Sequence, residues 1–207
     1  METTKRIRQR LKRVRRELSA ERATDMNQNL CRWLLDSPLL EHSRRLAAYL
    51  PHGGEPDLQP VLEKAARNHR DTFLPVVRDD PNPRLVFRAW QPGQPLQRNP
   101  FGIPEPPPDA QEITGEALCV VLVPLVAFDG QGNRLGMGAG YYDRTFAFLR
   151  DAPDTQRPAL IGTAWSFQQV EALAAQEHDV PLDAAVTENG WHGPWHPRAR
   201  HLLPHPS

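Results

Sequence analysis

The segment from Asp129 to Arg144, DGQGNRLGMGAGYYDR, is the densest group of residues that could bind a phosphate. Its alternating glycines would let backbone N–H groups approach an anion closely, and Arg134 could pair with a phosphate through two hydrogen bonds. Asp143 could hold a Mg²⁺ ion that bridges phosphate oxygens. The Gly-x-Gly-x-Gly spacing matches neither the dinucleotide fingerprint nor the Lys-Ser/Thr phosphate loop, so a tight structural turn is the alternative interpretation.

Two acidic loops could contribute to the same site. Glu55 follows the apolar run Leu46 to Leu50 and could accept hydrogen bonds from an amino-substituted heterocycle, although an ordinary helix-capping acid is the alternative. Asp179 or Asp183 could be a second metal carboxylate and His178 a base. A polar turn before the last strand is the alternative, and it is the favoured interpretation when this segment is read alone.

The segment from Lys5 to Arg16 carries eight basic side chains and no acidic one. Ile7, Leu11 and Val14 recur at helical spacing, which predicts a helix with one apolar stripe and a basic remainder. This charge would suit the phosphates of a nucleotide or of nucleic acid, although a charged helix face is often simply solvated. Because Lys+Arg and Asp+Glu both number 25, the chain lacks the basic field typical of nucleic-acid-binding proteins.

The remaining sequence predicts one domain that positions these loops. Apolar runs typical of buried strands occupy residues 46–50, 72–77, 85–90, 118–124, 159–164 and 184–187, and helices are expected at 6–18, 20–35, 58–68, 141–149 and 167–175. We therefore expect an α/β fold, a single three-layer domain with a mostly parallel, Rossmann-like sheet flanked by helices, over residues 1–189. Residues 190–207, rich in Pro and His, are expected to form a flexible C-terminal tail.

The cysteines and the lack of targeting segments favour a location in the cytoplasm. Cys31 and Cys119 lack metal-binding or redox spacing, and neither a signal peptide nor an apolar stretch of membrane-spanning length is evident. We expect a cytoplasmic, monomeric protein that binds neither membranes nor nucleic acid.

Taken together, these motifs resemble the 5-formyltetrahydrofolate cyclo-ligase family, also called methenyltetrahydrofolate synthetases. The resemblance rests on the basic first helix, Tyr-Leu-Pro…Gly-Glu at 49–55, Phe-Gly-Ile-Pro-Glu-Pro at 101–106, the block 124–144 and His-Asp-Val-Pro-x-Asp at 178–183. It implies an ATP- and Mg²⁺-dependent conversion of 5-formyltetrahydrofolate to 5,10-methenyltetrahydrofolate, with release of ADP and phosphate. In this family the formyl oxygen is phosphorylated, N10 attacks the activated carbon, and phosphate leaves.

The resemblance also implies site residues. ATP would be bound by Lys5, Arg8, Arg134, Leu135, Gly136, Met137, Gly138, Ala139, Gly140, Tyr141 and Tyr142. The folate would be bound by Leu50, Glu55, Phe101, Met137, Gly138, Ala139, Gly140 and Tyr141, and Mg²⁺ by Asp143 and Asp179. No covalent nucleophile is expected.

This chain departs from the family pattern at two places. Relatives often carry a lysine at the position of Thr4, where Lys5 would substitute, and basic residues where this loop has Met137 and Ala139. The alternatives are a small nucleic-acid-binding protein that uses the basic helix, and another Rossmann-like nucleotide enzyme.

Overall fold

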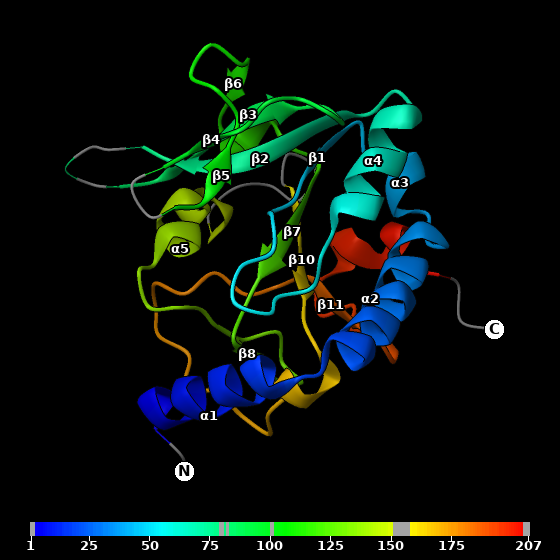
Figure 1. The fold of residues 1–207 in the computed structure, drawn as a ribbon. Helices are drawn as coiled ribbons and strands as arrows, with labels where there is room; N and C mark the ends of the chain where they lie inside the picture. Colours follow the sequence, from blue (N-terminus) through cyan, green and yellow to red (C-terminus); the bar gives the residue numbers. More distant parts are fainter. Residues whose placement is uncertain (1–2, 79–80, 82, 100–101, 151–157, 205–207) are drawn as a thin grey trace.

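The computed structural model describes residues 3–78, 81, 83–99, 102–150 and 158–204, which build around an eight-stranded sheet of order β12-β11-β10-β7-β1-β2-β3-β6 (Figure 1). The strands are β1 (Arg45–Ala47), β2 (Asp71–Val77), β3 (Leu85–Trp90), β6 (Glu112–Ile113), β7 (Val120–Pro124), β10 (Ala159–Thr163), β11 (Ala184–Thr187) and β12 (Gly190–His192). Strands β2, β1, β7, β10 and β11 pair in parallel, whereas β3, β6 and β12 join through antiparallel pairs.

Five α-helices and several short elements complete the described chain. The helices are α1 (Thr4–Glu17), α2 (Ala20–Leu35), α3 (Leu39–His42), α4 (Gln59–Arg67) and α5 (Tyr141–Thr145). Two small hairpins pair β4 (Gln97–Arg98) with β5 (Pro104–Glu105) and β8 (Ala127–Phe128) with β9 (Arg134–Leu135). The 3-10 turns are η1 (Gly115–Ala117), η2 (Ala147–Arg150), η4 (Ser166–Gln168) and η5 (Pro197–Leu202). None of the described helices is long and apolar enough to span a membrane.

Both faces of the sheet are covered, which confirms the predicted α/β fold. Alternate residues of β7 enter two different cores: Val120 and Leu122 pack on the side of α2 and α4, and Val121 and Val123 pack on the opposite side with Phe146. Side chains that are buried on both faces need no polar alternation. This is the physical reason that the strand is a continuous apolar run in the sequence.

Helix α1 lies across the carboxyl end of β7, against the β8–β9 hairpin (Figure 1). Its Ile7 and Leu11 are buried with Val126, Ala127 and Leu135. This apolar contact fixes the helix with most of its basic side chains directed away from the core, so that the sheet, the hairpin and α1 meet where ligands bind in α/β proteins.

The predicted helix at 167–175 does not form beyond the short turn η4. The N–H of Val170 donates to the carbonyl of Phe128 at 2.8 Å, and the N–H of Leu173 donates to Oδ2 of Asp129 at 2.9 Å. These bonds to the β8–β9 segment replace the bonds that a helix would make, because buried backbone donors take whichever partner the fold supplies.

The prediction of a flexible tail from residue 190 is wrong for residues 190–204. Strand β12 pairs with β11, and Trp195 N–H donates to the carbonyl of Asp183 at 2.8 Å. Ala199, Leu202 and Leu203 are buried in the core that α2 and α4 cover. The apolar side chains scattered among the prolines therefore attach this segment to the domain.

Candidate active-site cleft

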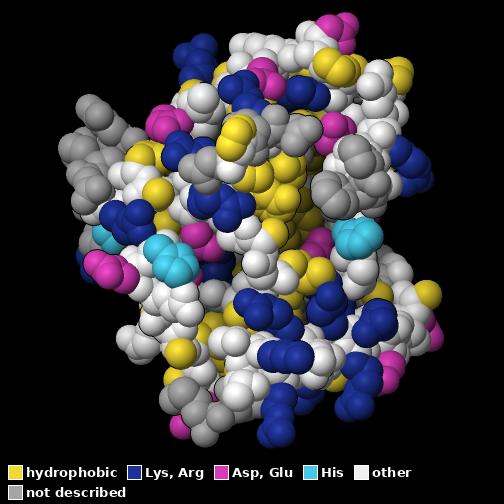
Figure 2. Space-filling model, turned by 90° about the vertical axis from the view of Figure 1, so that its left-hand side faces the viewer, with side chains coloured by type: hydrophobic (Ala, Val, Ile, Leu, Met, Phe, Trp, Pro, Cys, Tyr) yellow, Lys and Arg dark blue, Asp and Glu magenta, His cyan; other side chains and the backbone are white. Residues whose placement is uncertain are grey.

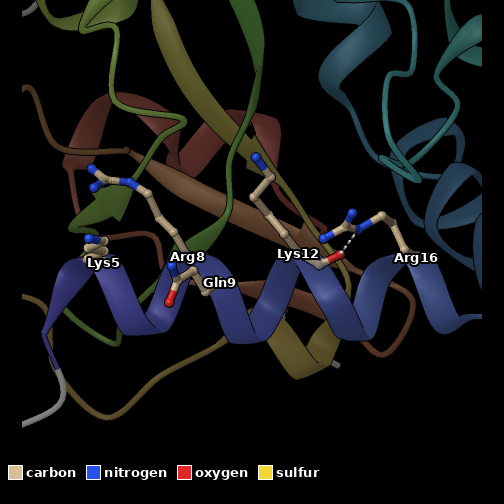
Figure 3. A pocket seen from close by; sticks show the side chains of 5 residues that line it. All are labelled: Lys5, Arg8, Gln9, Lys12 and Arg16. Carbon is tan, nitrogen blue, oxygen red and sulfur yellow. Dashed lines mark hydrogen bonds between the residues drawn. The ribbon is translucent and has the colours of Figure 1, made fainter.

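A cleft opens at the end of the sheet that α1 crosses. Figure 2 shows a hollow with a largely hydrophobic interior and a row of Lys and Arg side chains below it. Along α1 lies a groove of about 300 Å³, lined by Lys5, Arg8, Gln9, Lys12 and Arg16 (Figure 3). These side chains recur every three or four residues, so they share one face of the helix and concentrate positive charge there.

The glycine loop lies beside this groove. The Arg8 Nε–H donates to the carbonyl of Gly136 at 2.9 Å, and a Cβ placed on Gly138 would lie 3.9 Å from the Arg8 guanidinium. Gly138 and Gly140 adopt φ values of +108° and +66°, which glycine tolerates far better than other residues. The backbone N–H groups of 136–139 donate to none of the described residues. The loop thus presents unpaired donors next to a guanidinium, as an anion site requires.

Arg134 has a different environment from the one the sequence suggested. Its side chain is only 5% exposed; Nη2 donates to Oδ1 of Asp143 at 2.7 Å, and Nη1 donates to the carbonyl of Val180. In this arrangement Arg134 neutralises Asp143 instead of presenting its terminal nitrogens to the cleft. Helix α5 ends at Thr145 and is shorter than predicted, so its dipole supplies less of the positive field than expected.

The two predicted metal carboxylates lie on neighbouring segments. Val180, the residue after Asp179, donates its N–H to Oδ1 of Asp143 at 3.1 Å. Asp179 Oδ2 accepts from the Gln176 N–H at 2.8 Å. Asp183 instead is fully buried and accepts from Leu160 N–H at 2.7 Å, so it joins β11 to β10.

This donor set suits Mg²⁺. No group of three or more His, Cys, Asp or Glu that could hold a metal occurs among the described residues. Magnesium is usually bound by one or two carboxylates together with phosphate oxygens and water, so a pair of aspartates beside an anion site is sufficient.

Glu55 lies next to Arg15 of α1, and its side chain is 12% exposed. Its Oε1 is 3.5 Å from Arg15 Nη1, and its Oε2 accepts from the His52 N–H at 3.1 Å. Burial raises the pKa of Glu55, and the charge of Arg15 partly opposes that rise. Glu55 is therefore a largely buried carboxylate that could accept hydrogen bonds from a ligand.

Two phenols, those of Tyr49 and Tyr142, lie within electrostatic reach of Glu55. The hydroxyl of Tyr49 is 2.8 Å from Oγ1 of Thr163. Burial, and secondly the charge of Glu55, raise the pKa of both Tyr49 and Tyr142, so both phenols stay neutral at physiological pH. The Trp165 Nε1–H donates to the carbonyl of Gly54, the residue before Glu55, at 2.9 Å.

Some predicted site residues lie elsewhere, and others were missed. The Leu135 side chain packs under α1 with the apolar stripe and does not line the groove, and Phe101 lies outside the described residues. Sequence reasoning missed Arg15, Thr163 and Trp165. Arg15 follows Arg8 by seven residues, two helical turns, and this spacing was a signal that both face the same side.

The fold and the cleft together place the chain among α/β enzymes that bind their ligands at the carboxyl ends of parallel strands. The 5-formyltetrahydrofolate cyclo-ligase family model matches residues 1–188, and the chain belongs to this family.

Similar proteins agree with this family. The 5-formyltetrahydrofolate cyclo-ligase of Escherichia coli K12 is 35% identical over 178 residues, which cover 86% of this chain and 96% of that protein. The Haemophilus influenzae protein of the same name is 33% identical over 185 residues, which cover 88% of this chain and 97% of that protein. The NMR structure of Aquifex aeolicus 5,10-methenyltetrahydrofolate synthetase superposes with a TM-score of 0.76 at 29% identity, covering 92% of each chain.

Proposed function

We propose that this chain converts 5-formyltetrahydrofolate to 5,10-methenyltetrahydrofolate, with consumption of ATP and release of ADP and phosphate. One observation carries the proposal: the glycine loop and the cationic face of α1, which could bind an anion, lie near the buried carboxylate of Glu55. Such adjacent pockets suit a reaction that joins a phosphate donor to a polar heterocycle.

The phosphates of ATP are assigned to the groove along α1. Lys5, Arg8 and Lys12 supply positive charge there, and the free N–H groups of 136–139 supply directional donors. The charge comes from α1 because the loop itself has the exposed, uncharged Met137. Asp143 and Asp179 would hold Mg²⁺, which when bound neutralises charge on the transferring phosphoryl group.

The folate is assigned to the pocket of Glu55. The carboxylate would accept hydrogen bonds from the amino-substituted ring, with Leu50 beside it. Tyr141, whose ring carries the guanidinium of Arg144 at 5.3 Å, would face the folate from the end of the glycine loop. Tyr142 lies between the two proposed binding regions. The charge of Glu55 raises the pKa of its phenol, and the next residue, Asp143, is one of the two proposed metal ligands.

The chemistry needs little from side chains beyond positioning. The formyl oxygen attacks the γ-phosphorus and ADP leaves; N10 then attacks the activated formyl carbon, and the oxygen departs with phosphate as the ring closes. Phosphorylation turns a poor leaving group into a good one, so proximity and charge neutralisation account for catalysis.

A monomeric, cytoplasmic enzyme is part of the same proposal. The described Cys31 and Cys119 are free thiols, which suits a reducing compartment.

The test is the growth of methenyltetrahydrofolate absorbance from 5-formyltetrahydrofolate, with ADP measured in parallel. Product should form with one ADP per turnover, and omission of either ATP or Mg²⁺ should stop it. Absence of product in the complete mixture, from protein that melts cooperatively, would exclude the proposed reaction. Salt-dependent binding of RNA or DNA without ATP turnover would favour the nucleic-acid alternative.

A further inference from the structure

Arg15 differs from the other basic residues of α1. Its side chain is only 3% exposed, whereas that of Arg13 is 70% exposed. Burial of a guanidinium costs free energy unless the charge is paired and its donors are satisfied. A buried cation on a helix that is otherwise solvated therefore needs a specific reason.

The loop 53–55 is built around this side chain. Arg15 Nε–H donates to the carbonyl of Gly53 at 2.8 Å, and Nη1 lies 3.5 Å from Oε1 of Glu55. Gly54 adopts φ +81°, and a Cβ placed there would lie 3.0 Å from the carbonyl oxygen of Arg15 and 3.1 Å from its Cγ. Only a glycine lets the loop pass this close, so the backbone before Glu55 takes its course from Arg15.

The ion pair is incomplete. Arg15 Nη1 is buried and makes no hydrogen bond in the described structure, although Glu55 Oε1 is near. A small movement of the carboxylate would complete the bond, so the guanidinium restrains Oε1 of Glu55, while Oε2 accepts from the His52 N–H. A charged donor of this kind is among the stronger restraints a protein can place on a side chain.

We propose that Arg15 is a positioning residue for substrate binding: it fixes Glu55 in the orientation that receives the heterocycle of the folate. The inference rests on the proposed function, in which Glu55 binds that ring. Helix α1 thereby holds both pockets, because Arg8, about 10 Å earlier along the helix, binds the glycine loop.

Because Arg15 is charged, its proposed role should affect the pH dependence of folate binding, which a side chain that only fills space would not change. The groups that face Glu55 are Arg15, His52 and the neutral phenols of Tyr49 and Tyr142. Burial raises the pKa of Glu55, and Arg15 is the largest influence that lowers it. Removal of the guanidinium should therefore raise that pKa further, and folate binding should be lost at a higher pH.

The experiment measures dissociation constants for 5-formyltetrahydrofolate and for ATP between pH 5 and 8. Variants are Arg15→Met, Arg15→Lys, Glu55→Gln and the double variant Arg15→Met/Glu55→Gln, with Arg13→Met as the exposed matched control. Arg15→Met should weaken folate binding about tenfold at neutral pH and move its pH midpoint up by about one unit, while ATP binding changes less than about twofold. In the Glu55→Gln background the same change should have little further effect.

The outcomes separate the inference from the function on which it rests. If Glu55→Gln leaves folate affinity unchanged, the proposed role of Glu55 fails. If Glu55→Gln weakens folate binding but Arg15→Met alters neither affinity nor midpoint, or acts equally in both backgrounds, the inference fails. Should thermal melts show that Arg15→Met does not fold, Arg15→Lys decides: selective loss of folate affinity supports the inference, and wild-type affinity and midpoint overturn it.

Discussion

Asp143 has two roles in this structure, and its replacement by Asn should reveal both. Its Oδ1 accepts from the almost fully buried Arg134 at 2.7 Å and from Val180 N–H at 3.1 Å. An amide oxygen can still accept these bonds, but the charge that neutralises Arg134 is lost. Hydrogen bonds that involve charged groups contribute about 1.5–3 kcal/mol, so Asp143→Asn should destabilise the fold by about that amount. For a chain of this length the melting temperature should fall by about 3–12 °C.

Asp179→Asn is the matched control, because it removes the other proposed metal carboxylate without leaving a buried cation unpaired. Asp179 accepts from a backbone N–H at 2.8 Å, and its side chain is 35% exposed. The free energy of unfolding of Asp179→Asn should therefore differ from that of the wild type by less than about 1 kcal/mol. Both variants should raise the Mg²⁺ concentration for half-maximal methenyltetrahydrofolate formation by about tenfold or more, equivalent to about 1.4 kcal/mol of lost binding.

The assay is the ATP-dependent absorbance change at increasing Mg²⁺, at a temperature well below the melting point of each variant. If Asp143→Asn lowers the melting temperature but keeps the wild-type Mg²⁺ dependence, the carboxylate is only the counterion of Arg134. If it leaves the melting temperature unchanged, the ion pair does not contribute to folding and the energetic reasoning is refuted.

Three further predictions follow from the same structure. Arg8→Ala should raise the KM for ATP about tenfold and the KM for the folate much less, because a phosphate contact is lost. Steady-state kinetics test this, with the exposed Arg13→Ala as control. An equal rise of both KM values in Arg8→Ala would contradict the prediction. Burial raises the pKa of Glu55, so its contribution to stability is present at low pH and is lost as pH rises through that raised pKa, whereas folate affinity rises with pH over the same range. Melts and folate titrations between pH 4 and 8 should show these opposite slopes, and Glu55→Gln should abolish both; a slope that survives belongs to another group. Leu202→Ala should lower the free energy of unfolding by about 2–5 kcal/mol in denaturant titrations, because this side chain is 1% exposed in the core; an unchanged midpoint would show that the C-terminal segment is not docked.

Local pattern was sufficient for most of the elements. The predicted bounds of the second helix, 20–35, and of the strand 85–90 agree with α2 and β3, because Ser19 caps the helix and β-branched and aromatic residues fill the strand. The glycine loop, Glu55 and the paired carboxylates could be proposed for the same reason: their residue types and their position after buried strands are local information.

The failures share one cause. The helix expected at 167–175 lost its backbone donors to Phe128 and Asp129, which lie about forty residues earlier in the chain. The segment after 190 looked like a tail because its few apolar residues are separated by prolines, yet the core accepts Leu202. In each case a distant partner decided the outcome, and no window of sequence contains that partner.

The sequence by itself determined the class of fold, most of its strands and helices, and the residue types available for phosphate, metal and heterocycle. Only the tertiary structure decided what each charge does. Among the similar basic residues of α1, it placed Arg8 on the glycine loop, left Arg13 in solvent and buried Arg15 against Glu55. It also gave Arg134 to Asp143. The physical reason is that the energy of a charge depends on its burial and on its partner, and both arise only when distant segments pack together.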